Sequence, residues 1–514
     1  MEGEGVDARE QAEVIAFLAH PATWGVTGPV ERIDTHAAII FLAGDEAWKM
    51  KRAVRYPYLD FSTPERRRAV CEEELRINRR TAPDLYIDVS FVGRRANGTL
   101  AVNEGEPVDW LVHMRRFAPG SLLDTMAHEA PLAPALVREL ADAIAAFHEG
   151  AQVMAGPGAA RVRAVIEGNR ESMAALPADL LPAERRETLF ARSMDRLAAL
   201  APLLDRRAGE GCVRHCHGDL HLANICLWQG RPTLFDALEF DAALAETDVL
   251  YDLAFLVMDL VQRGLDDGAS LLLNRYCDRR SEADGLAAMG LFLSMRAAVR
   301  AHVEASAALT QTDADHRAAK VQASRSYLAA AFSFLEPQAP RLVAVGGLSG
   351  TGKSTLAGRL AARIAPAPGA RWLRTDVLRK RFAGLAPEDR LPASAYTPAA
   401  GQAVYAALFD EAKRVLATGT SVIVDGVFAD PDERAAVTAI AAAARVPLSG
   451  LWLEAPPDVL RARVSARTGD ASDADIAVVN RQLGYELGDL APWHVIDASG
   501  TMDDTLKRAM DRLG

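Results

Sequence analysis

The sequence predicts two domains of different fold class, an α+β domain followed by an α/β domain with a doubly wound parallel sheet. Three observations support this prediction. Up to residue 336, predicted strands come first and predicted helices later, which is an α+β order. Pro337 and Pro340 then interrupt the chain, because proline fixes φ and removes a hydrogen-bond donor. From residue 341 onward, predicted strands alternate with helices, which indicates a parallel sheet.

Length and composition are those of a globular protein with more than one domain. The chain has 514 residues, half of them hydrophobic and a quarter charged, and it is too long for one ordinary core. The net charge of −11 argues against nucleic acid as a partner. The N-terminus lacks the basic-then-apolar pattern of a secretory signal, and no apolar run reaches the roughly 18 residues that span a bilayer. With five cysteines in a long chain, we expect a cytoplasmic protein with reduced thiols and no membrane partner.

The first predicted domain, residues 1–336, opens with strands. Apolar segments at 37–42 and 47–51, separated by Ala43-Gly44-Asp45-Glu46, are typical of a β-hairpin. The charged stretch 65–81 predicts a helix that ends before Pro83. Further strands are expected at 85–92, 111–117 and 233–235, and helices dominate from residue 133.

The second predicted domain, residues 341–514, begins with a strand over 341–346 that leads into a glycine-rich loop and a helix over 355–364. Apolar segments at 372–375, 421–425 and 448–453 predict further strands, with helical stretches between them. This alternation predicts the doubly wound sheet.

The segment His217-Gly218-Asp219-Leu220-His221-Leu222-Ala223-Asn224 carries the first set of candidate catalytic residues. Phosphoryl transfer needs a base near the acceptor hydroxyl and ligands for the metal ion on the phosphates. Asp219 is the candidate base, and His217 would hold the loop in place. Asn224 lies at the spacing that suits a metal ligand, and Asp236, just past a short predicted strand, is the candidate magnesium carboxylate.

This motif set resembles the aminoglycoside phosphotransferase and choline kinase-like family, whose domain is protein-kinase-like, and the resemblance spans roughly residues 30–330. It implies a structural role for Asp252, which lies in a D-x-x-x-D-[LI]-A helix start. It also implies a strand lysine for the nucleotide phosphates and a helix glutamate that pairs with it. The A-x-K spacing favours Lys49, while Lys51 faces the same side and competes with it; Glu74 is the chosen partner.

A second phosphate site is predicted by the segment 347–354, which matches G-x-x-x-x-G-K-[ST] at every position. Glycines let backbone N–H groups converge on phosphate oxygens, Lys353 would reach the β- and γ-phosphates, and Ser354 would bind magnesium. Asp425, at the end of a predicted strand, is a further magnesium candidate, and a turn-forming role is the alternative. The expected nucleotide-binding residues are Gly347, Ser349, Gly350, Thr351, Gly352, Lys353, Ser354 and Thr355.

The sequence after this loop resembles small P-loop kinases such as gluconate kinase, polynucleotide kinase, chloramphenicol phosphotransferase and the zeta toxins. Asp376 and Arg379 match their D-x-x-R motif, so the resemblance implies that Asp376 activates the acceptor hydroxyl and Arg379 orients the acceptor. A helix N-cap is the alternative role for Asp376. Arg463 and Arg467 resemble the lid arginines that contact the transferring phosphoryl group.

Together the two parts resemble bacterial proteins that fuse the two kinase types. The resemblance implies a bifunctional ATP-dependent phosphotransferase with two nucleotide sites that acts on a hydroxyl of a small metabolite. ATP with Mg²⁺ is the expected cofactor pair, with GTP an alternative at one site. Two alternatives stay open. In the first, only one kinase is active and the P-loop module is regulatory. In the second, the C-terminal kinase acts on a polynucleotide or, like a toxin, on a nucleotide sugar. The sequence leaves the acceptors and the oligomeric state undefined.

Overall fold

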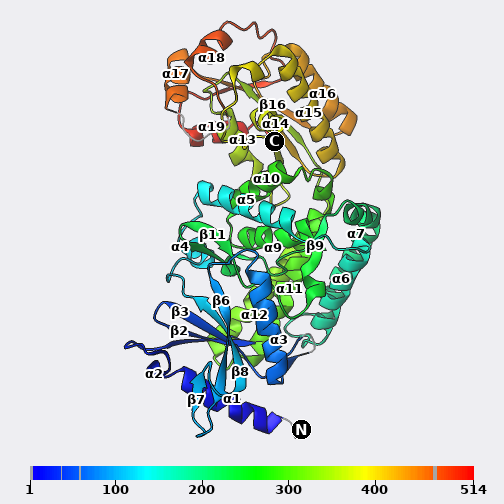
Figure 1. Ribbon diagram of the computed structural model, residues 1–514. Helices are drawn as coiled ribbons and strands as arrows, with labels where there is room; N and C mark the ends of the chain where they lie inside the picture. Colours follow the sequence, from blue (N-terminus) through cyan, green and yellow to red (C-terminus); the bar gives the residue numbers. More distant parts are fainter. Residues whose placement is uncertain (1–3, 36, 57–58, 467–471, 514) are drawn as a thin grey trace. The chain divides into compact units, whose positions relative to one another are not determined.

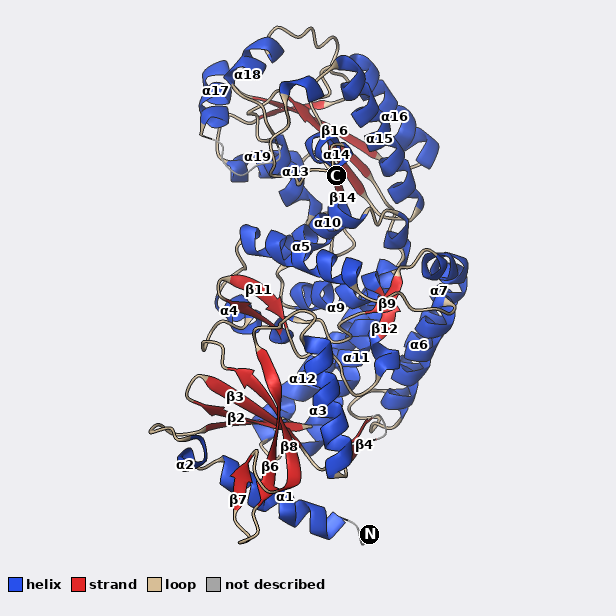
Figure 2. Cartoon of the chain, in the orientation of Figure 1, coloured by secondary structure: helices blue, strands red, loops and turns tan. Residues whose placement is uncertain are grey.

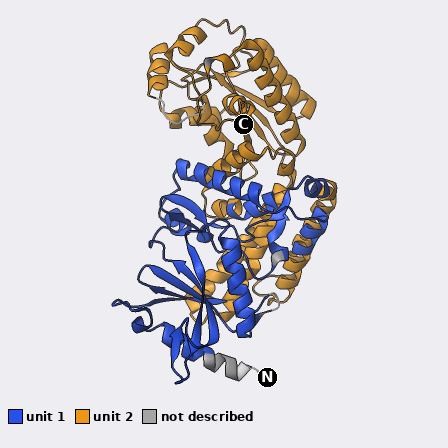
Figure 3. Ribbon diagram, in the orientation of Figure 1, with its two compact units in different colours: residues 1–165, 204–256 blue, residues 166–203, 257–514 orange. Residues whose placement is uncertain are grey.

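The computed structural model describes residues 4–35, 37–56, 59–466 and 472–513, and the chain divides into two compact units (Figure 3). The first unit comprises residues 1–165 and 204–256, and the second comprises 166–203 and 257–514. The second unit therefore combines several long helices that precede residue 336 with the whole C-terminal sheet. The domain boundary between residues 336 and 341 stays a prediction.

A six-stranded antiparallel sheet forms the N-terminal part of the first unit, with the strand order β1-β2-β3-β8-β6-β7 (Figure 2). The predicted hairpin is confirmed as β2 and β3, which pair from Ala38–Lys51 to Ala43–Glu46. The strands of this sheet are β1 (Glu31–Asp34), β2 (Ala38–Ala43), β3 (Glu46–Lys51), β6 (Tyr86–Arg94), β7 (Leu100–Val102) and β8 (Glu106–Arg115).

Helices cover both faces of this sheet. Alternate residues of β3 point to opposite faces, so Trp48 and Met50 pack with Val14 and Leu18 of α1 (Glu4–Leu18). On the other face, Cys71 of α3 (Pro64–Asn78) packs in a separate apolar cluster with residues of β3, β6 and β8. The predicted helix over 65–81 is therefore confirmed as α3. Thr63 caps its N-terminus by accepting a hydrogen bond from the Arg66 N–H.

The remaining elements up to residue 262 are mostly helical, with short strand pairs (Figure 1). The helical elements are α2 (Pro21–Trp24), α4 (Leu123–Glu129), α5 (Pro134–Gly150), α6 (Gly158–Ala174), α7 (Ala183–Gly209), η1 (Leu222–Asn224), α8 (Ala242–Ala245) and α9 (Val249–Gln262). The short strands are β4 (Arg55–Tyr56), β5 (Leu59–Asp60), β9 (Val213–His215), β10 (Ile225–Trp228), β11 (Arg231–Leu234) and β12 (Glu246–Asp248). They form the pairs β4-β5, β9-β12 and β10-β11.

The second unit contains a five-stranded sheet with the order β14-β15-β13-β16-β17, and every neighbouring pair is parallel. The predicted doubly wound fold is thus confirmed. The strands are β13 (Leu342–Gly347), β14 (Arg371–Arg374), β15 (Val422–Asp425), β16 (Leu448–Glu454) and β17 (His494–Asp497). β17 is not among the strands predicted from the sequence. It is an edge strand of four residues, and three of them are exposed, so its apolar pattern is weak.

Helices and connecting turns complete this unit. They are α10 (Asp266–Arg280), η2 (Asp284–Ala288), α11 (Met289–Thr310), α12 (Ala314–Leu335), α13 (Lys353–Ala361), α14 (Thr375–Phe382), η3 (Ala393–Ala395), α15 (Pro398–Ala417), α16 (Pro431–Ala444), α17 (Pro457–Ser465), α18 (Ile476–Gln482) and α19 (Met502–Met510). The apolar stretch Asp284–Thr310 is long enough to cross a membrane, but 67% of its most apolar window is buried, as in the core helix of a globular protein.

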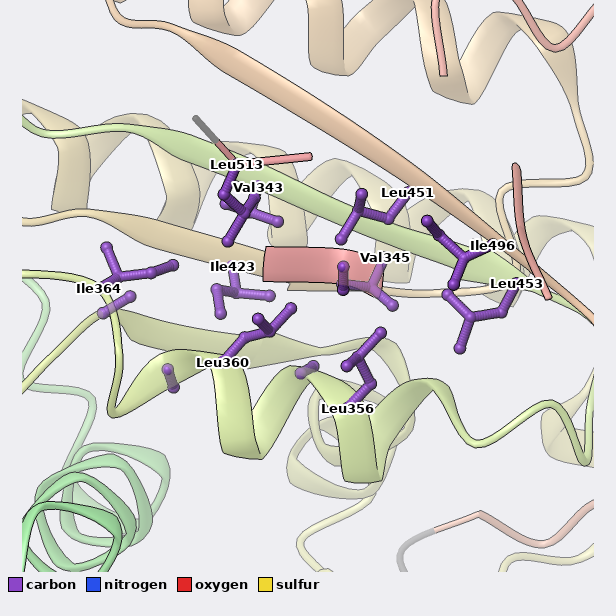
Figure 4. Packing of buried hydrophobic residues seen from close by; sticks show 14 of the residues in the cluster. Val343, Val345, Leu356, Leu360, Ile364, Ile423, Leu451, Leu453, Ile496 and Leu513 are labelled. Carbon is purple, nitrogen blue, oxygen red and sulfur yellow. The ribbon is translucent and has the colours of Figure 1, made fainter. Parts of the chain in front are cut away.

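The core of the parallel sheet lies between its strands and the helices α13 and α19. Val343 and Val345 of β13 and Leu356 and Leu360 of α13 point into this layer (Figure 4). Because β13 and α13 flank the segment 347–354, this packing fixes the loop at the carboxyl end of the central strand. That edge is where open parallel sheets bind their ligands.

Candidate active sites

The first candidate site is built on β3, which directs Lys49 and Lys51 to the same face of the antiparallel sheet. Lys49 Nζ lies 2.8 Å from Glu74 Oε1 on α3 and 2.5 Å from Asp236 Oδ1. The structure therefore brings together the three residues to which phosphate and metal roles were given. Lys49 is the lysine in contact with the candidate metal carboxylate.

Lys51 shares Glu74 with Lys49 but has a different second partner. Lys51 Nζ lies 2.6 Å from Glu74 Oε2 and also pairs with Glu239. The Lys51 side chain is 2% exposed and that of Glu239 is 8% exposed, so this pair is enclosed by protein. No local sequence pattern reveals Glu239 as a partner of Lys51, because the two residues lie 188 positions apart.

The opposite charges favour the ionised forms of Lys49 and Glu74. Burial alone would lower the pKa of Lys49, but Asp236 and Glu74 raise it well above its ordinary value. Burial would raise the pKa of Glu74, yet the two lysines lower it to about 2. A charged Lys49 beside charged carboxylates is the state that phosphate binding requires.

The candidate catalytic loop, residues 217–224, is held by Asp252, the second aspartate of the D-x-x-x-D motif. Its carboxylate accepts hydrogen bonds from the backbone N–H groups of Gly218 at 2.8 Å and His217 at 3.2 Å. His148 Nε2 lies 3.0 Å from the same carboxylate. The buried His217 ring contacts the Phe235 carbonyl oxygen at 3.0 Å. The loop is therefore fixed on both sides, and Asp252 acts on its backbone.

Asp219 and Asn224 contact each other within this loop. The Asn224 amide nitrogen donates to Asp219 Oδ2 at 2.9 Å and to the Asp219 carbonyl oxygen at 2.9 Å, so the amide oxygen is not used in these contacts. The Asp219 side chain is 39% exposed, as a base that meets a substrate hydroxyl must be accessible. Oxygen donors of this kind are the ligands that Mg²⁺ prefers.

Asp236 occupies a left-handed backbone conformation with φ 59°. Two side chains stabilise this turn: Tyr86 Oη accepts from the Asp236 N–H at 3.1 Å, and Asn78 Oδ1 accepts from the Ala237 N–H at 2.8 Å. Both residues lie more than 140 positions earlier in the chain, so sequence spacing did not reveal them. The turn directs the Asp236 carboxylate to Lys49, and its oxygen chemistry fits a magnesium ligand.

The nearby acidic residues are engaged in local contacts. Glu239 pairs with Lys51, Glu246 Oε2 lies 2.9 Å from Arg161 Nη1, and Asp241 Oδ1 accepts from the Ala243 N–H at 2.9 Å. These carboxylates therefore do not form a joint acidic surface of the kind that would meet a polycationic substrate.

The second candidate site is the phosphate-binding loop between β13 and α13. Gly347, Gly350 and Gly352 have φ values of 137°, 89° and 89°, which L side chains rarely adopt. A Cβ atom on Gly350 would also lie 2.6 Å from the Leu460 carbonyl oxygen. Lys353 Nζ donates to the Leu348 carbonyl oxygen at 3.0 Å, and so does Thr351 Oγ1 at 2.8 Å. The loop thus has the backbone shape that a phosphate nest requires.

Gln482 of α18 contacts this loop. Its Oε1 accepts from the Ser349 N–H at 2.7 Å, and both residues are buried. The sequence alone does not reveal this contact, because Gln482 lies 133 positions after Ser349. Thr355 is exposed in the first turn of α13.

Ser354 and Asp425 form the candidate magnesium pair of the second site. The Ser354 side chain lies near the buried Asp425 carboxylate at the end of β15 and acts against the rise of the Asp425 pKa. Trp372 Nε1 donates to Asp425 Oδ2 at 3.3 Å, and Arg374 Nε lies 4.0 Å from the same oxygen. Burial raises the pKa of Asp425, and Arg374 and Lys353 act against this rise. A hydroxyl and a carboxylate oxygen at this position fit Mg²⁺ coordination.

Asp376 and Arg379 lie on α14, one helical turn apart. Asp376 is half-buried in the first turn and does not occupy the N-cap position, which belongs to Arg374. Arg379 lies over the Tyr396 ring at 5.0 Å and donates to the Ala395 carbonyl oxygen at 3.2 Å. Tyr396 Oη in turn donates to Asp473 Oδ2 at 2.7 Å, which connects α14 to the residues that precede α18.

Only Arg463 of the two candidate lid arginines lies within the described residues. Arg463 Nη1 donates to the Ala498 carbonyl oxygen at 2.8 Å and Nη2 donates to the Gly500 carbonyl oxygen at 3.0 Å. Its guanidinium is thus engaged with the loop that follows β17. Arg467 lies outside the described residues. The catalytic role of both arginines stays a prediction.

A cavity of about 410 Å³ adjoins the phosphate-binding loop at Leu348 and Thr351. Its size is in the range of pockets that hold small organic molecules. Most of its lining is apolar, and Glu454 and Asp497 are its acidic residues.

Comparisons with known proteins agree with this two-site organisation. A family model described as "Phosphotransferase enzyme family" matches residues 58–292, and a model described as "AAA domain" matches residues 342–486. The uncharacterized proteins Rv2004c of Mycobacterium tuberculosis and Mb2027c of Mycobacterium bovis are each 31% identical to this chain over 512 residues. Each alignment covers 96% of this chain and 96% of the relative.

Solved structures resemble parts of the chain. A choline/ethanolamine kinase family protein from Mesorhizobium loti is 18% identical, with a TM-score of 0.36, over 63% of this chain and 99% of that chain. A gluconokinase from Sinorhizobium meliloti 1021 is 21% identical, with a TM-score of 0.25, over 34% of this chain and 91% of that chain.

The folds and the two family matches define a phosphotransferase of the kinase type that uses ATP. The chain belongs to a bacterial family, shared with the two mycobacterial relatives, in which an aminoglycoside phosphotransferase-like domain precedes a P-loop kinase domain.

Proposed function

We propose that the protein is a bifunctional kinase in which each site transfers the γ-phosphoryl group of ATP to a hydroxyl of a small metabolite. The observation that supports this most strongly is that both sites combine a phosphate lysine with a metal-type carboxylate. Lys49 contacts Asp236 in the first site, and in the second the Asp425 carboxylate lies near Ser354, which directly follows Lys353. A module that only bound nucleotide would not need a further candidate base such as Asp376.

In the first site, Asp219 accepts the proton of the acceptor hydroxyl as the oxygen attacks the phosphoryl group. Lys49 binds the phosphates and is held in place by Glu74. Asn224 and Asp236 would hold Mg²⁺, which neutralises charge on the phosphates when bound. In the second site, Asp376 takes the role of the base, Arg379 orients the acceptor, and Lys353 binds the phosphates.

The acceptors are best described as small hydroxylated metabolites. The carboxylates near the first site are engaged with Lys51 and Arg161, so a polycationic drug is not the substrate we favour. ATP is the donor that we propose for both sites, with GTP as the variant to test at the second site. None of the five cysteines, all within the described residues, forms a disulfide, which suits action in the cytoplasm.

The test is a metabolite-pool screen for ATP-dependent phosphorylation with the wild type, Asp219→Ala and Asp376→Ala. We expect each variant to lose one set of products and to retain the other. Glu72→Ala on α3 and Asp503→Ala on α19 remove exposed carboxylates and serve as matched controls. Products that persist in both active-site variants would reject the assignment of the bases.

One observation favours a second candidate function, a single kinase with a regulatory P-loop module. Lys353 Nζ and the Ser349 N–H are both bonded to groups of the protein itself, namely the Leu348 carbonyl oxygen and Gln482. Under this alternative, Lys353→Ala changes nucleotide affinity at the second site and the rate of the Asp219-dependent reaction, while Asp376→Ala changes no product. Polynucleotide and nucleotide-sugar acceptors belong in the same screen, because they are variants of the second-site reaction.

A further inference from the structure

The strand β14 lies at the edge of the parallel sheet, where one row of backbone groups lacks a neighbouring strand. The Arg371 N–H donates to the Ser421 carbonyl oxygen on the β15 side, so the groups of Ala370 and Trp372 face outward. Asn274 of α10 meets both of them: Nδ2 donates to the Ala370 carbonyl oxygen at 3.1 Å, and Oδ1 accepts from the Trp372 N–H at 2.7 Å. One side-chain amide thus makes the two hydrogen bonds that another strand would make.

The adjoining charges make this contact specific. Arg371 is 3% exposed and donates to Asn274 Oδ1 at 3.2 Å, to Asp278 Oδ1 at 2.6 Å and to Glu411 Oε1 at 3.1 Å. Asp278 is one turn beyond Asn274 on α10, whereas Glu411 belongs to α15. A buried arginine needs such partners, so β14 can occupy only one position along α10 without leaving charges unpaired.

The next residue of β14 connects this contact to the second site. The indole of Trp372 packs beside α13, where a Cβ atom on Gly358 would lie 3.1 Å from its Cζ3. The Arg374 guanidinium carbon lies over the Trp372 ring, 4.5 Å from the ring centroid. Held in this way, the Trp372 indole N–H donates to Asp425 Oδ2. A shift of Trp372 along or away from the sheet would remove this hydrogen bond.

We propose that Asn274 and Trp372 are positioning residues for the second site: Asn274 fixes β14, and Trp372 orients the Asp425 carboxylate for Mg²⁺. Helix α10 lies within the segment that matches the phosphotransferase model, residues 58–292, so this part of the chain completes the P-loop kinase site. The proposal rests on the proposed function in one respect, the assignment of Asp425 as a metal ligand. Groups that orient metal ligands commonly change metal affinity by ten- to a hundredfold when they are removed.

The experiment uses the full chain with Asp236→Asn as the parent, so that the metal response of the first site is weakened. Asn274→Leu removes both amide hydrogen bonds at similar volume, and Trp372→Phe removes the indole donor. The matched control is Asp267→Asn. Asp267 lies on the same helix as Asn274, and this substitution removes its exposed ion pair with Arg363. Three quantities are measured: the Mg²⁺ concentration that half-saturates ATP binding, hydrogen exchange of the β14 amides, and the Trp372 indole resonance without metal.

We expect Asn274→Leu to raise the half-saturating Mg²⁺ concentration about tenfold, to expose the Trp372 amide to exchange and to move the indole resonance. Trp372→Phe should give a similar loss of Mg²⁺ affinity while the β14 amides stay protected. Asp267→Asn should change none of these quantities. Since a general loss of stability would weaken ATP binding without Mg²⁺ as well, metal-free binding is the internal reference.

Two results would overturn the inference: a protected Trp372 amide in Asn274→Leu, or unchanged Mg²⁺ affinity in a folded Trp372→Phe chain. Failure of the proposed function looks different, because the parent chain would then show no metal-dependent ATP binding. In that case hydrogen exchange of the β14 amides and the Trp372 indole resonance, both measured without metal, test the inference. Asp425→Asn should also move the indole resonance.

Discussion

At the scale of single residues, Lys49 and Lys51 show how two neighbouring lysines acquire different tasks. Both contact Glu74, but Lys49 reaches Asp236, which is 37% exposed, whereas Lys51 reaches the enclosed Glu239. A ligand can therefore replace a partner of Lys49 but has no access to Lys51. This difference suggests phosphate binding for Lys49 and a structural role for Lys51.

Methionine substitutions separate the two roles. Lys49→Met should lower kcat/KM of the Asp219-dependent reaction about a hundredfold, because a charge that stabilises the transition state is lost. Lys51→Met should lower the free energy of unfolding by about 3 kcal/mol, since it leaves Glu239 buried without its cation. Urea unfolding and steady-state kinetics measure both effects. The reverse pattern would assign phosphate binding to Lys51.

Asp252 supports the catalytic loop through its charge and its two acceptor oxygens. Asp252→Asn places an amide N–H where a backbone N–H must donate, so we expect a loss of about 2 kcal/mol in unfolding free energy. The kcat of the first reaction should fall more than its KM for ATP changes. Asp241→Asn, a nearby loop variant, should stay within about 0.5 kcal/mol of the wild type. Equal stability of both variants would contradict the structural role of Asp252.

At the scale of elements, α15 and α16 hold the loop that follows β15. Phe428 adopts φ 51°, and its N–H donates to Tyr405 Oη of α15 at 3.0 Å. The Tyr405 hydroxyl also lies near the Glu433 carboxyl of α16. The Val427 carbonyl oxygen accepts from the Gly347 N–H at 3.1 Å, so this loop also supports the phosphate-binding loop.

Glu433 makes the stability of this region depend on pH. Burial raises the pKa of Glu433 from its ordinary 4.5 to about 7, an effect that the Tyr405 hydroxyl partly offsets. The folded state then binds the proton more tightly than the unfolded state, so stability falls as pH rises from about 4.5 through 7. Urea unfolding between pH 5 and 8 should show a smaller fall for Glu433→Gln than for the wild type. Parallel curves would contradict this assignment.

Local sequence patterns predict the elements whose signals are local, and they miss contacts between distant segments. The glycines and Lys353 are contiguous, and Asp219 and Asn224 lie five residues apart, so a motif reveals them. Asn274 and Trp372 are 98 positions apart and neither belongs to a motif. Tyr86 and Asn78 likewise support Asp236 only through tertiary folding. The roles of Arg463 and Arg467 stay predictions, because Arg463 contacts the loop after β17 and Arg467 lies outside the described residues.

At the scale of the whole molecule, hydrogen bonds within the second unit link segments on the two sides of the predicted boundary near residue 340. The edge of β14 is completed by α10, which lies about 90 residues before it in the chain. An edge strand without its partner offers free backbone groups to other chains. The C-terminal kinase fold therefore depends on a helix that the sequence assigns to the preceding domain.

A truncated chain of residues 341–514 should consequently self-associate. We expect light scattering to show oligomers or aggregates at micromolar concentration, because β14 can pair with a second copy. A longer chain that begins at residue 257 keeps α10, α11 and α12 and should stay dispersed under the same conditions. If the shorter chain is the better dispersed of the two, α10 does not protect this edge.

The position of Asn274 also bears on the order in which the molecule is made. Synthesis runs from the N-terminus, and domains generally fold in that order. Helix α10 leaves the ribosome before β14 exists, so the new strand meets a finished template when it emerges. The aggregation-prone edge of the growing sheet is then covered during synthesis. The order of the two modules along the chain therefore helps the P-loop module to fold without aggregation.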